Sequence, residues 1–112
     1  MITQKVYAFT KYPDFKRDFG LSDQARRSAV SIMSNIAEGF ERSGNREFRN
    51  FLSIAKGSCG ELESELVVAR DQRYISRDEY MDFIRLIRRT NQLIWGLMRH
   101  LAGSSYKGAK YK

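Results

Sequence analysis

Apolar residues recur at helical spacing along most of the chain, most regularly in its middle. There the apolar positions alternate between steps of four and three residues: Phe48, Leu52, Ala55, Cys59, Leu62, Leu66 and Ala69. The same spacing returns toward the C-terminus, with one polar member: Tyr80, Ile84, Ile87, Asn91, Ile94, Met98 and Leu101. Such stripes are typical of helices that pack side by side in bundles and coiled coils. The spacing therefore predicts two long helices that share one core.

A shorter apolar segment opens the chain. Ile2, Val6 and Phe9 follow helical spacing, and Pro13 comes after them, followed by the turn-like stretch DFKRDFG. Proline and glycine mark turns and ends of helices. We expect a first helix here, the shortest of the chain, with a turn behind it.

A further helix is expected after Ser22. Serine caps helix N-termini, and Asp23 is favourably placed at the positive end of the helix dipole. This helix extends to about Arg42, and its apolar stripe is Ala25, Ala29, Ile32, Ile36 and Phe40. The sequence RSGN ends it, and Asn45 is placed to cap the next helix.

The last reversal of the chain is expected around Tyr74 and Ile75. The sequence SRDE, from Ser76 to Glu79, is a capping box for the final helix. No strand-like alternation competes with the helical pattern. We therefore predict an all-α fold: an antiparallel up-and-down four-helix bundle over residues 1–102, with a short first helix, and a basic flexible tail over residues 103–112.

The last helix has a wider apolar surface than a monomeric bundle requires. Its apolar residues extend from Leu86 and Leu93 on one flank to Trp95 on the other, an arc of roughly 200° where roughly 100° suffices. We predict that something besides the bundle core covers Leu93 and Trp95. The alternative is that both side chains wrap the edge of the core.

A line of small residues follows the helix of residues 48–69 opposite its core stripe. Ser53, Gly57, Gly60 and Ser64 form this line. A glycine inside a helix costs about 1 kcal/mol relative to alanine, so close approach of another backbone is the expected reason for two of them. A neighbouring helix, another subunit and a phosphate backbone are the candidates, and we favour helix–helix packing.

Polar residues follow the flank of the apolar stripe that contains Ala25 and Ala29. They are Ser28, Ser31, Asn35 and Glu38. Polar groups so placed can hydrogen bond across a helix pair, and buried ones must do so. We interpret Ser31, Asn35 and Glu38 as a structural polar seam, in which Asn35 and Glu38 set the packing register.

The chain is basic, with a net charge of +7. Arg85, Arg89 and Arg99 lie within about 80° of the last helix, with Arg88 at the edge, and they extend about 21 Å along its axis. Guanidinium groups in such an array can follow a phosphate backbone. We predict that these arginines bind nucleic acid; a solvated helix face is the alternative.

The last ten residues add positive charge and contain no acidic residue. Lys107, Lys110 and Lys112 are interleaved with Tyr106 and Tyr111. Lysines can contact phosphates, and tyrosines can stack on bases. The tail is therefore predicted to extend the nucleic-acid surface, and a solubilising tail is the alternative.

Residues for catalysis or metal binding are few. His100 is the only histidine, and neither a cysteine nor paired acids stand at ligand spacing from it. Glu61, Glu63 and Glu65 alternate, so they cannot form one metal-binding helix face. A pair of Glu38 and Glu61 lacks the Glu-x-x-His partners of bundle metal sites. We predict no enzymatic activity, no metal and no cofactor.

Cysteine usage and hydropathy indicate the compartment. Cys59 is the single cysteine, and its place in the apolar stripe predicts a small buried side chain rather than a reactive thiol. No segment approaches the ~18 consecutive apolar residues of a membrane span, and the start MITQKVYAFTK lacks the apolar core of a secretory signal. We expect a soluble cytoplasmic protein without membrane contact.

Several of these motifs occur together in a known family. The stretch RRSAVSIMSNIAEGFERSGNREFRNFLSIAKGSCGELESEL, followed by RYISRDEY, closely resembles the four-helix-bundle proteins encoded by intervening sequences within bacterial large-subunit ribosomal RNA genes. The resemblance covers about residues 21–101, and the motifs SNIAEG and EFxxFLxIAxGSxxELE carry it. That family is related to the accessory variability determinant of diversity-generating retroelements.

The resemblance implies an up-and-down four-helix bundle, a ring-like homopentamer and, for the retroelement relative, binding to nucleic acid and to a reverse transcriptase through a basic surface. The chain departs from the family at Met33, where members usually have proline, and ahead of VYAFTKYP, where members have a longer first helix containing tryptophan. We expect a non-enzymatic oligomer that binds RNA or DNA nonspecifically. The alternative is an accessory subunit whose main partner is a protein, such as a reverse transcriptase.

Overall fold

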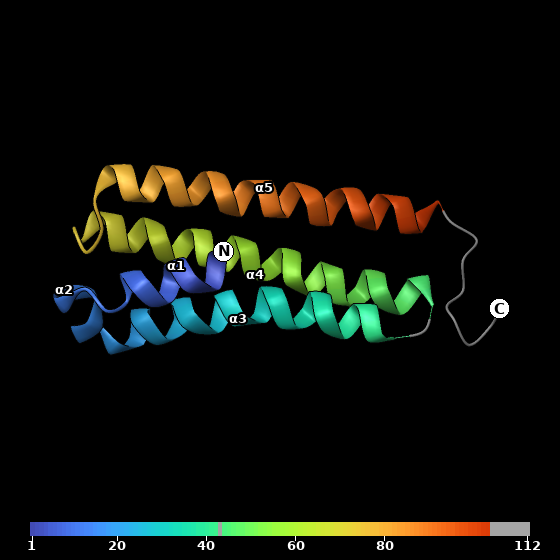
Figure 1. Cartoon of the computed structure of the whole chain (residues 1–112), viewed down its shortest axis with the longest axis horizontal. Helices are drawn as coiled ribbons and strands as arrows, with labels where there is room; N and C mark the ends of the chain where they lie inside the picture. The colour runs from blue at the N-terminus through green and yellow to red at the C-terminus, as the bar shows by residue number, and fades with distance from the viewer. Residues whose placement is uncertain (43, 104–112) are drawn as a thin grey trace.

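The computed structural model describes residues 1–42 and 44–103, and all the regular structure in them is helical. The five helices are α1 (Ile2–Phe9), α2 (Pro13–Arg17), α3 (Phe19–Glu41), α4 (Asn45–Asp71) and α5 (Arg77–Ala102). The three long helices lie side by side, each antiparallel to the one before it (Figure 1). The predicted helical bundle is confirmed. None of the described helices is long and apolar enough to cross a membrane.

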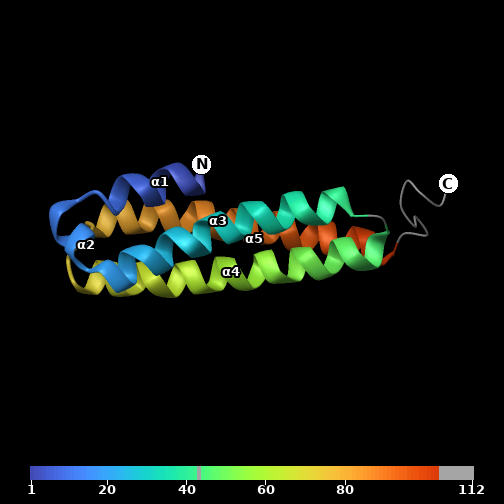
Figure 2. The ribbon, with the colours of Figure 1, turned by 90° about the horizontal axis from the view of Figure 1, so that it is seen from below.

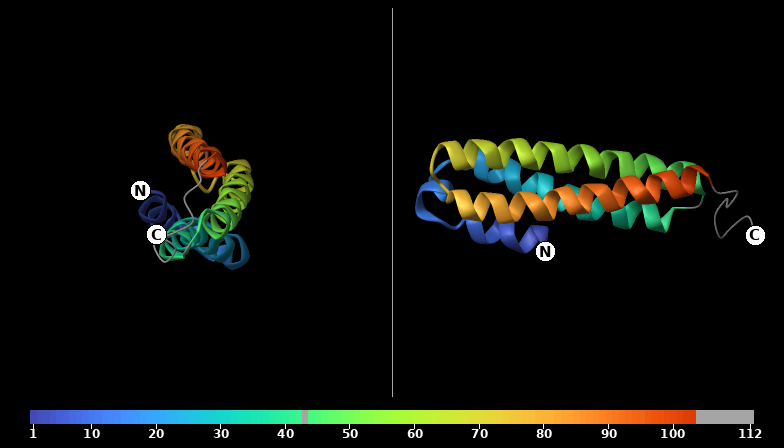
Figure 3. Two further views of the ribbon diagram at one scale, coloured as in Figure 1. Left: turned by 90° about the vertical axis from the view of Figure 1, so that its right-hand side faces the viewer. Right: turned by 90° about the horizontal axis from the view of Figure 1, so that it is seen from above.

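The short α1 completes the bundle over only part of its length (Figure 2). α4 packs against both α3 and α5, and α1 also packs against both α3 and α5. Seen end-on, the three long helices form an arc with α1 on its open side (Figure 3). α1 has 8 residues and α5 has 26, so α1 covers about 12 Å of about 39 Å. One end of the bundle is therefore four-helical and the other three-helical.

The apolar stripe of α4 is the centre of the core, as its spacing predicts. Its buried members are Leu52, Ala55, Cys59, Leu62, Leu66 and Ala69. From α5 the predicted residues Ile84, Ile87 and Ile94 are buried as well. Phe83, outside the predicted stripe, is also fully buried, because its ring meets Phe9 of α1 edge-on with 5.4 Å between ring centroids.

The stretch after Pro13, predicted as a turn, contains the short helix α2. Pro13 is its first residue, a position where the missing N–H of proline needs no partner. Phe15 is fully buried and stacks on Tyr74, with 5.4 Å between ring centroids. The Tyr74 hydroxyl donates to Asp18 at 3.0 Å. α2 therefore closes the four-helical end of the bundle against the turn between α4 and α5.

The predicted cap of α3 is wrong, whereas that of α5 is confirmed. α3 begins at Phe19, and Asp18 caps it by accepting a hydrogen bond from the Leu21 N–H at 3.2 Å. Ser22 is buried within the first turns of α3. At α5, the Ser76 hydroxyl accepts from the Glu79 N–H at 3.0 Å, and the Glu79 carboxylate accepts from the Ser76 N–H at 2.7 Å.

The predicted cap of α4 is also wrong. Asn45 is the first residue of α4, and its side-chain amide donates to the Leu101 carbonyl at 3.3 Å. Gly44 takes the cap position with a φ of 93°, a conformation that favours glycine. Asn45 therefore ties the start of α4 to the end of α5.

Beyond the start of α1, the channel between α3 and α5 continues as an open groove of about 720 Å³. Its main apolar lining residues are Ile32, Met33, Ile36 and Phe40 of α3 and Leu86 of α5. Phe40, predicted in the core stripe, is 75% exposed. The reason is that α1 does not extend along this part of α3, because its first turn lies at the near end of the groove.

Candidate nucleic-acid interface

The outward side of α5 carries four exposed arginines, here called the arginine face. They are Arg85, Arg88, Arg89 and Arg99. α5 is a single uninterrupted helix that begins at a satisfied capping box, so the backbone positions that carry these four side chains are fixed relative to one another. Arg99 lies in the last turn, where the helix dipole favours a cation.

Two members of the arginine face are paired with carboxylates. Arg85 contacts Asp82 of its own helix at 3.0 Å, and Arg88 contacts Glu63 of α4 at 2.9 Å. The hydrogen bond from Arg88 to Glu63 raises the pKa of the Arg88 guanidinium. Exposed ion pairs contribute about 0–1 kcal/mol, so a phosphate can compete for both arginines.

Arg89 and Arg99 are the other two members. Within residues 1–42 and 44–103, neither takes part in an ion pair. Their guanidinium groups are exposed and lie about 15 Å apart along the helix axis. They are therefore the members of the arginine face that can meet phosphate without first losing a carboxylate partner.

Lys107, Lys110 and Lys112 lie outside the described residues, together with Tyr106 and Tyr111. Their predicted contribution to nucleic-acid binding stays a prediction.

Leu93 and Trp95 both project from the protomer rather than into its core. Leu93 is 67% exposed and Trp95 is 49% exposed. The Trp95 ring lies 5.8 Å from the Lys56 ammonium of α4, a cation–π contact. Leu93 is therefore not wrapped around the core edge of the protomer, and its cover by something besides the bundle core stays a prediction.

The line of small residues on α4 also faces outward. Ser53, Gly57, Gly60 and Ser64 are all exposed. A Cβ atom built at Gly57 or Gly60 would meet no atom within 4 Å. No neighbouring helix of the described protomer reaches these glycines, so packing within the protomer does not account for them, and close approach of another molecule stays a prediction.

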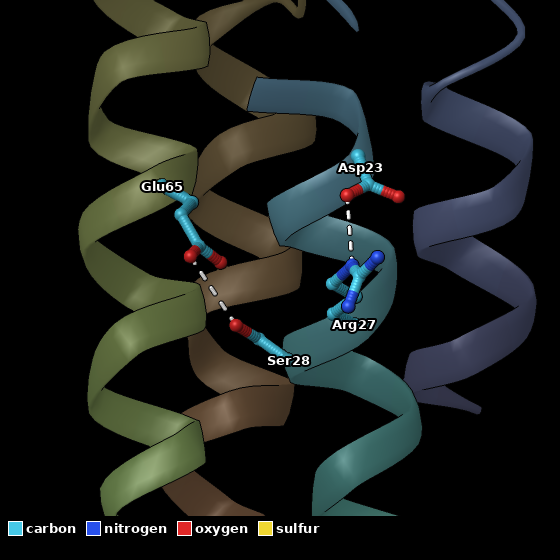
Figure 4. Close-up of polar contacts among 4 residues, drawn as sticks. All are labelled: Asp23, Arg27, Ser28 and Glu65. Carbon is cyan, nitrogen blue, oxygen red and sulfur yellow. Dashed lines mark hydrogen bonds and ion pairs between the residues drawn. The ribbon is translucent and has the colours of Figure 1, made fainter. Parts of the chain in front are cut away.

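The polar seam between α3 and α4 is formed by two serines of α3. Ser31 shares a hydrogen bond of 2.8 Å with Ser58, and the Ser28 hydroxyl donates to Glu65 at 3.2 Å. Figure 4 shows Glu65 reaching from α4 to Ser28, beside the ion pair of Asp23 and Arg27 on α3. The second Glu65 carboxylate oxygen is buried and has no hydrogen-bond partner among the described residues.

Asn35 joins the seam only through Ser31, since its side-chain amide donates to the Ser31 hydroxyl at 3.0 Å, whereas Glu38 makes no hydrogen bond to α4 among the described residues. Asn35 donates to the Ser31 carbonyl of its own helix at 2.8 Å, and Glu38 pairs with Arg42 at 2.8 Å, also on the α3 side. Both partners lie four residues away in sequence, so these contacts are local. The contacts that set α3 against α4 come from Ser28 and Ser31 instead.

The match to known sequences covers α1 to α4 and most of α5. Residues 1–96 match the 23S rRNA-intervening sequence protein family. The chain belongs to this family. A solved protein of unknown function, from the S23 ribosomal protein family of Bacteroides thetaiotaomicron, has a similar fold with a TM-score of 0.74 and 25% sequence identity. The similarity covers 88% of this chain and 99% of that chain. No curated protein matches.

Within the described part of this 23S rRNA-intervening sequence protein, no group of three or more metal-ligating side chains is gathered. His100 is exposed at the end of α5. Because Ser31 faces Ser58 and the helices are antiparallel, Glu38 and Glu61 lie on opposite sides of that contact, about 15 Å apart along the axis. These two carboxylates therefore do not form a pair.

Sequence reasoning did not find Ser58 and Glu65 of the intervening-sequence protein as seam residues. Their spacing was the available signal, since seven residues separate them and both flank the α4 core stripe. Glu65 was not recognised because acidic residues alternate at positions 61, 63 and 65, and the sequence does not distinguish among them. In the structure, Glu65 alone of the three receives a hydrogen bond from α3.

Proposed function

We propose that this 23S rRNA-intervening sequence protein is a non-enzymatic oligomer that binds RNA or DNA without sequence preference through the arginine face of α5. Arg89 and Arg99 carry this proposal, because both are exposed cations without an ion-pair partner among the described residues. The arginine face extends about 21 Å from Arg85 to Arg99 along one rigid helix. This length allows contacts with several successive phosphates.

The proposed binding is electrostatic. Each arginine that neutralises a phosphate releases condensed counterions, so affinity falls as salt rises, with a logarithmic slope of about −0.9 per contact on duplex DNA. A single protomer offers four such arginines, which is few for stable binding at physiological salt. In a ring-like oligomer, such as the pentamer that the family resemblance implies, each subunit repeats the arginine face, and the repeated weak contacts add to useful avidity.

Self-association has its own support. Leu93 and Trp95 expose apolar surface on α5, and Gly57 and Gly60 leave the backbone of α4 open to close approach. Sedimentation in the analytical ultracentrifuge tests this part of the proposal. A strictly monomeric protein at all concentrations contradicts it.

A filter-binding titration tests nucleic-acid binding. We expect retention of a structured RNA and of a duplex DNA at low salt, with affinity that weakens steeply as ionic strength rises. Replacement of Arg85, Arg89 and Arg99 by Ala flattens the salt slope by about 3 × 0.9 on duplex DNA if each arginine contacts a phosphate. The matched control replaces Arg17, Arg27 and Arg46, three exposed arginines of other helices, and so makes the same change in net charge.

The control variant is expected to keep most of the slope. Failure of the wild-type protein to retain either nucleic acid at low salt contradicts the proposal.

The alternative function is an accessory subunit whose main partner is a protein, such as a reverse transcriptase. The exposed Leu93 and Trp95 favour it, and partner binding that persists at high salt would identify it.

A further inference from the structure

A small hollow of about 400 Å³ lies where the chain passes from α1 through α2 into α3. Five residues line this Phe19 hollow, and none of them is acidic: Lys11, Pro13, Lys16, Arg17 and Phe19. The hollow lies at the α2 end of the bundle, whereas the apolar groove begins at Met1, at the other end of α1 (Figure 2). The hollow and the groove are therefore separate surfaces.

Phe19 is the residue of this lining that the fold does not explain. It is the first residue of α3 and is 79% exposed, the highest value among the seven phenylalanines. It belongs neither to the core cluster nor to an aromatic pair of the described residues. A second hollow, bordered by Gly20 and Arg26, also reaches Phe19. The ring therefore offers open surface that the protomer itself does not use.

Two lysines of the hollow supply positive charge. Among the described residues, neither Lys11 nor Lys16 takes part in an ion pair. Arg17, the third cation of the lining, contacts Asp14 at 3.8 Å. Asp18, which caps α3, already accepts two hydrogen bonds. The hollow therefore combines an open aromatic ring with two ammonium groups that an anion can reach.

The backbone beneath the hollow is held from the inside of the bundle. Phe15 is fully buried and stacks on Tyr74. Thr10, the neighbour of Lys11, is also fully buried, and its hydroxyl accepts a hydrogen bond from Arg26 at 2.8 Å. The backbone positions that carry the ring and the two lysines are therefore fixed before any ligand arrives, which lowers the entropic cost of binding.

We propose that the Phe19 hollow binds one unpaired nucleotide of a single-stranded nucleic acid. The base stacks on the Phe19 ring, and the phosphates that flank the base contact Lys11 and Lys16. An aromatic ring beside cations holds single strands without regard to sequence, because every base has a π-face and every nucleotide has a phosphate. The volume of the hollow is within the range of about 300–1,000 Å³ that is usual for small-ligand sites.

A membrane surface, the competing partner for lysines beside an exposed aromatic ring, fits the hollow less well. Helices that lie on membranes bury a broad apolar face in the lipid interface. The aromatic residue of the five-residue α2, Phe15, is instead fully buried in the protein, so Phe19 is the one large apolar side chain of the lining. One ring is enough to stack one base but gives little area for insertion into lipid.

The inference rests on the proposed function for the class of partner, and it adds unpaired bases to the phosphates that the arginine face contacts. The two surfaces are separable by the form of the nucleic acid. In a duplex the bases stack on one another, so a duplex can use the arginine face but not the Phe19 ring.

Fluorescence anisotropy with two single strands at low salt tests the inference. The first probe is an octamer of thymidylate, which does not pair with itself, and the second is an octamer of the same backbone without bases. We expect the wild-type protein to bind the thymidylate octamer about tenfold more tightly than the abasic one. This comparison uses the unaltered protein, so it does not depend on the folding of a variant.

Phe19→Ala assigns the preference to the ring. We expect this variant to bind the thymidylate octamer about tenfold more weakly than the wild type and to bind the abasic octamer unchanged. Phe40→Ala is the matched control, because Phe40 lies on the same helix, is 75% exposed and does not line the hollow. It is expected to behave as the wild type with both octamers.

The lysines are tested together, because each contributes a phosphate contact. Replacement of Lys11 and Lys16 by Ala is expected to weaken binding of both octamers and to flatten the logarithmic salt slope by about 2 × 0.7 on a single strand. Replacement of Arg27 and Arg46 by Ala makes the same change in net charge on other exposed positions. This control is expected to keep most of the slope.

Three results overturn the inference and leave the arginine face standing. They are equal binding of the two octamers by a protein that binds duplex, equal effects of Phe19→Ala and Phe40→Ala, and Phe19-dependent binding to phosphatidylserine vesicles without a preference for bases. Loss of duplex binding in the arginine-face variant, with the preference for bases intact, supports two separate surfaces. No binding of any nucleic acid by the wild type contradicts the inference and the proposed function together.

Discussion

Gly39 of α3 lies so close to Phe51 of α4 that a methyl group on Gly39 would come within 2.9 Å of the Phe51 Cβ. The same methyl group would come equally close to the Cδ1 atom of Phe48. The Phe48 ring can rotate, but the Cβ of Phe51 is fixed to the backbone of α4. The glycine of the SNIAEG motif is therefore explained by helix packing, and no chemistry is needed to account for it.

We predict that Gly39→Ala destabilises the fold. Overpacking of a tight contact costs about 1–3 kcal/mol, and the better helix propensity of alanine returns about 1 kcal/mol. The expected net loss in the free energy of unfolding is about 1 kcal/mol. Urea denaturation followed by circular dichroism measures it, and a variant as stable as the wild type would show that α3 and α4 are not this close.

Gly57→Ala is the matched comparison, and we predict the opposite sign. A Cβ atom at Gly57 meets nothing within 4 Å in the protomer, so the substitution gains only helix propensity, about 0.5–1 kcal/mol. The measurement is made at a concentration where sedimentation shows monomers. Destabilisation there would mean that the described protomer already crowds this position. Destabilisation only in the oligomer would place Gly57 at a subunit contact.

The long helices could be predicted from sequence because the apolar spacing of α4 and α5 repeats over six or more turns and corresponds to one physical requirement, a shared core. The ends of the helices could not. Asp18 caps α3 while its other carboxylate oxygen accepts from Tyr74, 56 residues away, and Asn45 donates to Leu101, also 56 residues away. Local sequence shows a capping residue but not which tertiary partner selects it.

For the candidate interface, the sequence predicted which residues share one face of the helix, but not which partners their side chains contact. The angular spacing of Arg85, Arg89 and Arg99 follows from the helix alone, and the structure leaves all three exposed. The pairing of Arg88 with Glu63 depends on how α4 and α5 align, which no local pattern specifies. The small residues of α4 were also only partly interpretable, because their spacing predicted close packing, whereas a Cβ atom at Gly57 or Gly60 meets no atom of the described protomer within 4 Å.

Cys59 is predicted to resist thiol reagents until the protein unfolds. It is buried in the α4 stripe, and burial raises the pKa of its thiol to about 11, so little thiolate exists near neutral pH. Because Cys59 is the only cysteine, any alkylation by iodoacetamide reports on it alone. We expect negligible native labelling and complete labelling in denaturing urea. Rapid labelling of the native protein would contradict the position of this stripe in the core.

Glu65 gives a pH-dependent prediction. Burial raises the pKa of Glu65, against the opposing hydrogen bond from Ser28, and the nearby charge of Glu61 raises it further. The folded chain therefore binds this proton more tightly than the unfolded chain, so ionisation reduces stability once the pH passes the ordinary carboxyl pKa of about 4.3. Glu65→Gln removes the ionisation and keeps an oxygen that can accept from Ser28.

We expect Glu65→Gln to be more stable than the wild type at neutral pH, with a difference that disappears below about pH 4. Thermal unfolding across this pH range measures it. Ser28→Ala in the same series tests the local cause, because loss of the hydroxyl should enlarge the benefit of Glu65→Gln. A stability difference that is constant with pH would show that ionisation of Glu65 is not its source.

Glu63→Gln is predicted to strengthen nucleic-acid binding, which separates the arginine face from the general charge of the protein. Glu63 accepts a hydrogen bond from Arg88 at 2.9 Å, so its neutralisation leaves a third member of the arginine face, besides Arg89 and Arg99, without an ion-pair partner among the described residues. One added phosphate contact steepens the logarithmic salt slope by about 0.9 on duplex DNA. Glu61→Gln is the control, because it makes the same change in net charge on the same helix, two residues away. Equal gains in the two variants would assign the effect to net charge, whereas a gain confined to Glu63→Gln would assign it to Arg88.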